Sequence, residues 1–277
     1  MNLRSQVLRV AGGLLLAAVT LAPAIAQPGP AAAKAPAALQ ALERRGLEVV
    51  GTLPAPAGMS AYAGFMGQQP LALYVTPDGK QLIAGTLIGA DGSDQTHAAL
   101  DKAVARPMAE AVWRQLGASR WVADGRSGAP VVYVFTDPNC PYCNQLWSEA
   151  RPWVAAGKVQ LRHVIVGILT PTSPGKAAAL LAAKDPAATL AAYEGANAAA
   201  TARAMAGGHP RPLADGSLQP LSTIPPATQA ALDANAHLME GLGLQATPAI
   251  VWRTAQGALQ VSEGLPQGGL ASVLGPR

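Results

Sequence analysis

Short apolar runs alternate with turn residues over the first third of the chain. Four runs have the length and composition of β-strands: Leu47–Leu53, Ser60–Met66, Leu71–Val75 and Gln81–Ile88. Between the last two, the segment 76–80 (Thr-Pro-Asp-Gly-Lys) predicts a turn, because proline presets φ and glycine tolerates a positive φ. A helix-prone segment, Ala37–Arg45, precedes the strands. The pattern predicts a small antiparallel sheet whose exposed edges favour pairing with a second copy.

A connector follows, with a helical pattern on both sides of Pro107. Gln95–Val104 and Met108–Leu116 are predicted as helices, and Pro107 either kinks one helix or opens a second. Trp113 and Trp121 are expected to be packing anchors rather than binding residues.

From Pro130 onward the pattern predicts alternating strands and helices. Val131–Phe135 is a continuous β-branched and aromatic run, as expected of a strand buried on both faces. The further expected elements are a helix through Ala150, a strand at Val159–Val166, a helical block at Pro174–Gly207 broken near Lys184–Pro186, a loop at Gly207–Pro226, a helix at Ala227–Leu242, a hairpin of Ala249–Trp252 with Leu259–Val261, and a short final helix. This order predicts a central sheet covered by helices.

The N-terminus has the pattern of an export signal. Arg4 and Arg9 precede an apolar run, Val10–Ala22, and the segment 24–26 (Ala-Ile-Ala) supplies a small-x-small cleavage pattern. The run of about 13 residues is shorter than the roughly 20 that a spanning helix needs. We therefore expect a signal peptide cleaved after Ala26, and export to a compartment where disulfides persist.

Charge and composition add little to the picture. The formal net charge of +4 falls to 18 minus 16, or +2, once Arg4 and Arg9 are removed. No Lys/Arg cluster alternates with aromatic residues, so nucleic acid is not an expected partner. Residues 27–36 are rich in proline and alanine and are expected to form a leader without regular structure.

The chain has two cysteines, and both follow the predicted strand at Val131–Phe135. Pro141 suits the first turn of a helix, which places Cys140 at the helix N-terminus. There, unpaired N–H groups and the helix dipole stabilise a thiolate, the attacking species in disulfide exchange. Cys143 lies about one turn further in. We interpret Cys140 as an exposed attacking thiol and Cys143 as a buried resolving thiol.

Two other interpretations of the cysteine pair are less favoured. A structural disulfide would close a loop of only four residues, worth about 2 kcal/mol against about 3 for a 15-residue loop. A zinc site would need two further ligands, and the four histidines show no paired spacing: His97, His163, His209 and His237. His163, inside a predicted strand, is expected to be structural and the others to lie at the surface. No metal and no cofactor is expected.

Several stretches of the sequence resemble one family. They are "LYVTPDGKQLIAG" from Leu73, "VYVFTDPNCPYCNQLW" from Val132, "ARPWVAAGKVQLR" from Ala150, "AAALLAAKDPAAT" from Ala177 and "TPAIVW" from Thr247. The chain resembles the DsbG/DsbC family of periplasmic thiol:disulfide interchange proteins over nearly all of its mature length, and it is most similar to the DsbG type. Tyr142 between the cysteines favours that type.

The resemblance implies an α+β and α/β fold: a small antiparallel sheet domain for dimerisation, a linker helix, and a thioredoxin-like domain with a helical insertion. The implied boundaries are signal peptide 1–26, dimerisation domain 27–92, linker 93–119 and catalytic domain 120–277, with the insertion at about 172–242. In thioredoxin-like folds a cis-proline faces the cysteine pair. This implies that Pro248 is cis, and that Thr247, Pro248, Pro141 and Tyr142 contact substrate.

The implied function is that of a periplasmic disulfide isomerase or reductase with chaperone-like activity, able to rescue sulfenylated single cysteines. The implied partners are a second copy in a V-shaped homodimer, oxidised or misfolded periplasmic proteins, and a DsbD-type membrane electron donor. A chaperone with a secondary redox role and a dithiol oxidase remain alternatives.

Two features depart from the family pattern. Residues 195–226 look longer and richer in proline and glycine, which puts their role in substrate choice in doubt. Asn139 stands before Cys140 where an aromatic residue is expected, which could alter access to the thiolate.

Overall fold

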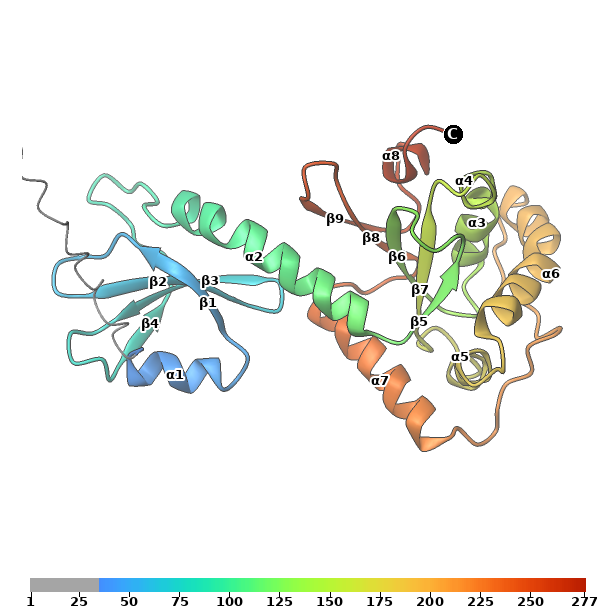
Figure 1. Cartoon of the computed structure of the whole chain (residues 1–277), viewed down its shortest axis with the longest axis horizontal. Helices are drawn as coiled ribbons and strands as arrows, with labels where there is room; N and C mark the ends of the chain where they lie inside the picture. Colours follow the sequence, from blue (N-terminus) through green and yellow to red (C-terminus); the bar gives the residue numbers. More distant parts are fainter. Residues whose placement is uncertain (1–34) are drawn as a thin grey trace, which may run out of the picture. The chain divides into compact units, whose positions relative to one another are not determined.

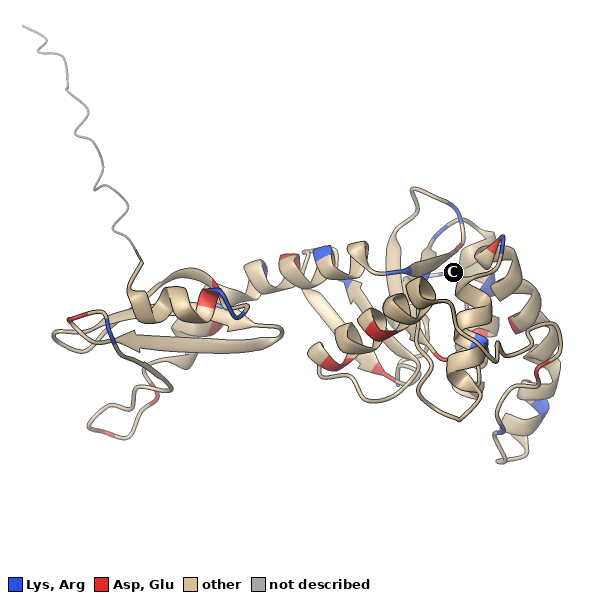
Figure 2. Ribbon diagram, turned by 90° about the horizontal axis from the view of Figure 1, so that it is seen from below, with Lys and Arg blue, Asp and Glu red and all other residues tan. Residues whose placement is uncertain are grey.

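The computed structural model describes residues 35–277, which contain two β-sheets (Figure 1). The predicted signal peptide, residues 1–26, and all but the last two residues of the predicted leader lie outside the described residues. Across residues 35–277, every helix is too short or too polar to cross a membrane. Lys/Arg and Asp/Glu residues are interspersed along the ribbon (Figure 2).

The first sheet is antiparallel throughout, with strands in the order β1-β2-β3-β4. Helix α1 (Ala37–Glu43) precedes it, and the strands are β1 (Glu48–Leu53), β2 (Ser60–Met66), β3 (Gln69–Val75) and β4 (Leu82–Ala84). β4 is shorter than the predicted strand at Gln81–Ile88. Beyond Gly85, whose N–H still donates to Ala72 of β3 at 3.1 Å, the chain bonds elsewhere: the N–H of Leu87 donates to the hydroxyl of Thr96, just before the next helix.

A single helix, α2 (His97–Ala118), runs through Pro107, so of the two alternatives predicted there the one with a proline inside one helix is found. Proline inside a helix removes a hydrogen bond and costs about 3 kcal/mol. Packing on both sides of Pro107 offsets this cost. Leu100 and Val104 lie in the core of the first sheet, and Val112 and Leu116 lie in a core of the second sheet.

The second sheet has the strand order β5-β7-β6-β8-β9, with β6 and β7 parallel and the other neighbours antiparallel. The strands are β5 (Trp121–Asp124), β6 (Val131–Thr136), β7 (Gln160–Ile165), β8 (Ala249–Arg253) and β9 (Leu259–Glu263). The sequence pattern missed β5, an edge strand of four residues. Both tryptophans are packing residues as predicted: Trp113 meets Tyr133 edge to face at 5.0 Å, and the Arg162 guanidinium lies 4.2 Å from the ring centroid of Trp121.

Helices pack on both faces of the second sheet. They are α3 (Pro141–Glu149), α4 (Arg151–Ala155), α5 (Ser173–Leu181), α6 (Pro186–Ala206), α7 (Pro226–Gly241) and α8 (Ala271–Leu274). Side chains of β6 alternate between two cores. Tyr133 and Phe135 pack with α2 and α7, whereas Val132 and Val134 pack with α3 and α4. The predicted fold class is confirmed.

The segment at 195–226 is part helix and part loop, in agreement with the predicted helical block up to Gly207 and the predicted loop after it. Its first part continues α6 to Ala206, and only residues 207–225 connect α6 to α7. More than half of residues 195–206 are alanines, and alanine is the strongest helix former.

Candidate functional site

The cysteine pair lies where β6 ends and α3 begins. Cys140 is the N-cap of α3, in extended backbone conformation, and Pro141 occupies the first helical position, as predicted. The Cys140 Sγ accepts a hydrogen bond from the backbone N–H of Cys143 at 3.1 Å. The N–H of Cys143, which has no partner within the first turn of the helix, thus points at the Cys140 sulfur.

Sheet pairing brings a second segment to the cysteines. β6 and β8 are neighbours, with Phe135 opposite Ala249, so the residues just before β8 lie beside the residues just after β6. The Thr247–Pro248 peptide bond is cis, which confirms the prediction for Pro248. The Cys140 thiol donates to the carbonyl oxygen of Thr247 at 3.3 Å.

Both cysteines are buried, with Cys140 1% exposed and Cys143 2% exposed, and no disulfide joins them. The interpretation of Cys140 as an exposed thiol was therefore wrong. Its sulfur lies between the first turn of α3 and the backbone of Thr247, and these contacts exclude solvent. The exposed member of the motif is Tyr142, at 45%.

The pKa values of the two thiols are shifted in opposite directions, down for Cys140 and up for Cys143. The hydrogen bond from the Cys143 thiol lowers the pKa of Cys140, and Thr247 and the Cys143 N–H add to this against the effects of burial and of Asp137. Burial raises the pKa of Cys143 well above its ordinary value, and the neighbouring Cys140 sulfur raises it further. Of the two thiols, Cys140 therefore loses its proton more readily.

Asp137 fixes the turn that leads into Cys140. Its carboxylate is fully buried, and one oxygen accepts from the N–H of Asn139 and the hydroxyl of Ser173, both at 2.8 Å. The other oxygen accepts from the N–H groups of Ile168 and Leu169 at 2.7 and 3.0 Å. One carboxylate thus ties the turn after β6 to the loop after β7. The sequence signal for it was an aspartate directly after a buried strand.

Asn139 is buried at 2% exposed, so its side chain turns into the protein. Its amide nitrogen donates to three hydroxyls, those of Thr170, Thr172 and Ser173. Its amide oxygen accepts from the ammonium group of Lys176 at 2.7 Å. An aromatic residue could not make these bonds, so Asn139 is an anchor for the turn that carries Cys140.

Lys176 on α5 has no exposed surface and binds four groups. Besides Asn139, its Nζ lies 3.0 Å from the Tyr193 hydroxyl, 2.8 Å from the Leu213 carbonyl and 2.8 Å from the Asp215 carboxylate. It therefore joins the cysteine turn to α6 and to the 207–225 loop. Sequence reasoning missed it, although a single cation inside an apolar helix, "SPGKAAALL", was a signal.

A second polar contact joins α3 to α6. The Asn144 amide donates to the backbone carbonyl of Glu194 at 2.8 Å and to its carboxylate at 2.6 Å. Both residues are buried, and burial raises the pKa of Glu194 to about 7 against the opposing effect of the bond from Asn144.

The histidines do not form a metal site. His163 is buried, with Nδ1 2.9 Å from the Thr136 hydroxyl and Nε2 3.5 Å from Asp124, so it is structural as predicted. The other three are exposed: His97, His209 and His237. Over residues 35–277, no three His, Cys, Asp or Glu side chains gather as metal ligands would.

A cysteine pair at a helix start, opposite a cis-proline, on a mixed sheet covered by helices defines the thioredoxin-fold thiol–disulfide oxidoreductases. Residues 125–267 match the family described as thioredoxin-like domain. The thiol:disulfide interchange protein DsbG of Pseudomonas aeruginosa is 44% identical over 249 residues, covering 89% of this chain and 91% of that protein. The protein of the same name from Escherichia coli K12 is 39% identical over 254 residues, covering 91% and 93%.

The chain belongs to the DsbG family of thiol:disulfide interchange proteins. Its expected resemblance to this family is thereby confirmed, and disulfide exchange with substrate proteins is its activity. Among solved structures, the catalytic domain of Proteus mirabilis ScsC is 20% identical, with a TM-score of 0.45, covering 61% of this chain and 96% of that one.

Proposed function

We propose that Cys140 and Cys143 form the redox pair of a disulfide isomerase and reductase. The observation that supports this most directly is the position of the Cys140 sulfur. It lies between the Cys143 N–H at 3.1 Å and the carbonyl of Thr247 at 3.3 Å, next to a cis-proline. The lowered pKa of Cys140 and the raised pKa of Cys143 support an attacking role for the first and a resolving role for the second.

The exchange proceeds in two steps. The Cys140 thiolate attacks one sulfur of a client disulfide, forming a mixed disulfide and releasing the other client sulfur as a thiolate. In isomerisation that thiolate, or another in the client, attacks the mixed disulfide and frees Cys140. In reduction, Cys143 loses its proton and attacks the Cys140 sulfur, so the pair becomes a disulfide and the client gains two electrons.

Client polypeptide would bind at the rim of the cysteine site. Thr247 and Pro248 would align an extended client segment, and Pro141 and Tyr142 would contact it from α3. Tyr142, Ile168 and Leu169 support this assignment, because they are exposed at 45%, 47% and 46% and are held near the cysteine turn. A bound client would replace the contact between the Cys140 sulfur and Thr247.

Residues 27–92 would form a dimerisation domain, residues 93–119 a linker and residues 120–277 the catalytic domain, with an insertion at about 172–242. The exposed Ile83 and Ile88, at 60% and 56%, support dimerisation through the first sheet, since they lie in or just after its short edge strand. We place the mature homodimer, cleaved after Ala26, in the periplasm with a DsbD-type electron donor.

Two further activities fit the same site. With a sulfenylated client, Cys140 would displace the hydroxyl as water, using one proton, and Cys143 would resolve the mixed disulfide. Chaperone-like binding is supported by the exposed apolar side chains around the motif, which would hold unfolded segments without chemistry.

Trapping with a Cys143→Ala variant tests the assignment. This variant lacks the resolving thiol, so clients should accumulate as mixed disulfides on Cys140, separable on non-reducing gels. The matched control is the Cys140→Ala, Cys143→Ala double variant, which should hold none. Equal capture by both variants, or no capture by either, would overturn the assignment. Captured clients with a single cysteine would favour sulfenate rescue over isomerisation.

A further inference from the structure

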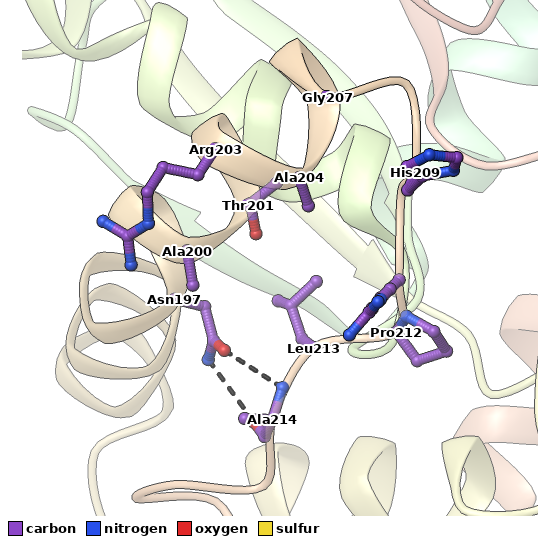
Figure 3. Close-up of a pocket in the computed structure, with 11 residues that line it drawn as sticks. Asn197, Ala200, Thr201, Arg203, Ala204, Gly207, His209, Pro212, Leu213 and Ala214 are labelled. Atoms are coloured by element: carbon purple, nitrogen blue, oxygen red, sulfur yellow. Dashed lines mark hydrogen bonds between the residues drawn. The ribbon is translucent and has the colours of Figure 1, made fainter.

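A hollow of about 460 Å³ lies between α6 and the first part of the loop that follows it. We call it the α6 hollow; its walls include Asn197, Thr201, Arg203, His209, Arg211 and Leu213. Figure 3 shows Arg203 on the helix side, with its side chain extending away from the loop, and His209 on the loop side, with Leu213 between the two. Neither the exchange chemistry nor the proposed client contacts at the rim use these residues.

The α6 hollow carries positive charge without a balancing acid. Residues 195–214 include Arg203, His209 and Arg211 but no Asp or Glu. None of these three side chains forms an ion pair with any residue in the described range 35–277. The next acid along the chain, Asp215, already binds Lys176 at 2.8 Å.

The carbonyl groups at the C-terminal end of α6 leave the positive charge of Arg203 and Arg211 available to an anion. A helix C-terminus ordinarily disfavours anions because its last carbonyls lack partners. Here three of them accept hydrogen bonds from the turn that follows: Arg203 from Gly207, Met205 from Gly208, and Ala204 from His209. The side-chain polar groups left for a ligand are the two guanidinium groups, the imidazole and the Thr201 hydroxyl, and this set of donors suits a carboxylate.

Backbone hydrogen bonds join the α6 hollow to the cysteine turn. The N–H of Leu213 donates to the carbonyl of Asn139 at 3.4 Å, and the carbonyl of Leu213 accepts from Lys176 at 2.8 Å. The Asn197 side chain holds Ala214 from α6 through bonds of 3.1 and 3.4 Å (Figure 3). Because Asn139 directly precedes Cys140, the Leu213 backbone lies one hydrogen bond from the residue next to the attacking cysteine, so a client segment of a few extended residues would span from that cysteine to this wall.

We infer that the α6 hollow is a docking subsite for a carboxylate-bearing segment of the client polypeptide, a few residues from the client cysteine. This inference rests on the proposed role of Cys140 and extends it to client choice. Docking there would favour clients with Asp or Glu near the reacting cysteine, and would raise the rate of the first exchange step through local concentration and charge attraction.

The test uses cysteine peptides linked through a disulfide to thionitrobenzoate. Attack by Cys140 on the peptide sulfur forms the mixed disulfide and releases coloured thionitrobenzoate. One peptide carries two glutamates three or four residues from its cysteine, and its partner carries glutamines. The wild-type protein should react with the acidic peptide about three- to tenfold faster, the gain expected from two exposed ion pairs. Added salt should reduce the difference.

The deciding variant is Arg203→Gln with Arg211→Gln, which should react with both peptides at the same rate. Arg44→Gln with Arg45→Gln is the matched control: it removes the same charge from exposed residues after α1 and should keep the preference. No preference in the wild-type protein, or a preference that survives the first variant, overturns the inference. A preference that depends only on a free peptide C-terminus, tested with amidated peptides, would overturn the choice of side-chain carboxylates.

A small uncharged disulfide separates this inference from the function on which it rests. Reaction with dithiodipyridine should depend on Cys140 and be equal in all these arginine variants. If Cys140 fails to react with it, the proposed function fails. If Cys140 reacts but ignores peptide charge, only the docking subsite fails.

Discussion

The sulfur of Cys140 contacts the carbonyl oxygen of Thr247 at 3.3 Å, across 107 positions of sequence. The two residues meet because β6 and β8 pair in the centre of the second sheet, and each lies just beyond the end of its strand. The two parts of the candidate site are therefore brought together by the pairing of two neighbouring strands of the sheet. The side chains of Cys143 and Thr247 should therefore affect the pKa of Cys140 in ways that can be measured.

The thiol of Cys143 should control the acidity of Cys140. Because its hydrogen bond is the largest cause that lowers the pKa of Cys140, Cys143→Ala should raise that pKa. Thiolate absorbance at 240 nm, titrated against pH, measures it. The wild-type value should lie below about 8.5, the value of a free cysteine. In the control, Cys140→Ala, the remaining thiol should titrate well above that value, and an unchanged Cys140 pKa in Cys143→Ala would contradict the assignment.

The hydroxyl of Thr247 should contribute to the same effect. It is buried and forms no hydrogen bond among residues 35–277, so it is available to donate to a Cys140 thiolate, in line with the lowering effect of Thr247 on the pKa of Cys140. Thr247→Val removes this donor at nearly constant volume, so the pKa of Cys140 should rise. Thr247→Ser keeps the hydroxyl and should leave the pKa near the wild-type value. Identical titration curves for the valine and serine variants would show that the hydroxyl has no part in it.

Lys176 and Asn139 should be energetically coupled. Lys176→Met leaves the Asn139 amide oxygen and the Leu213 carbonyl buried without their donor, which should lower the free energy of unfolding by about 3 kcal/mol. The exposed Lys184→Met should change it by less than about 0.5 kcal/mol. Urea denaturation of Lys176→Met, Asn139→Ala and the double variant gives the interaction energy, expected to exceed about 1 kcal/mol. Strictly additive losses would mean that the two residues act independently.

Glu194 should make stability depend on pH. Its pKa of about 7 in the folded protein lies above the value of about 4.3 for an exposed glutamate. The folded protein therefore keeps a proton on Glu194 at pH values where the unfolded chain has lost it. The resulting contribution to the free energy of unfolding is complete below about pH 4 and is lost as the pH rises to about 7. Glu194→Gln removes the titration but keeps an acceptor for Asn144. The variant should match the wild type near pH 4 and be more stable at pH 8, by up to about 3 kcal/mol. Parallel stability curves over that range would refute this.

Local sequence patterns were enough to predict most of the fold. β2 was predicted at the observed residues, and the break between α5 and α6 was expected where Pro186 opens a new helix. What the sequence left open or missed lies where distant contacts decide the structure. Pro107 allowed one helix or two, and packing of the two halves in separate cores favours the single α2, whereas β5 was missed because it forms only against its partner β7.

In the candidate site, too, features set by local sequence were predicted and features set by distant contacts were not. Cys140, Cys143 and Pro248 could be found because their chemistry depends on residue type and local position. Asp137 and Lys176 had local signals, but their roles could not be predicted, and Glu194 had none, because a buried charge in a sequence looks the same as an exposed one until its partners are known. Asn139 was recognised as unusual, but its role follows from hydroxyls more than 30 positions away.

Helix α2 supplies Leu100 and Val104 to one core and Val112 and Leu116 to another. If either core lost its structure, the half of the helix that remained would lose the packing that offsets Pro107. The first sheet and the cysteine-bearing sheet should therefore melt together, as one cooperative transition with a single heat-absorption peak, and damage to the small sheet should reach the redox pair as a loss of stability.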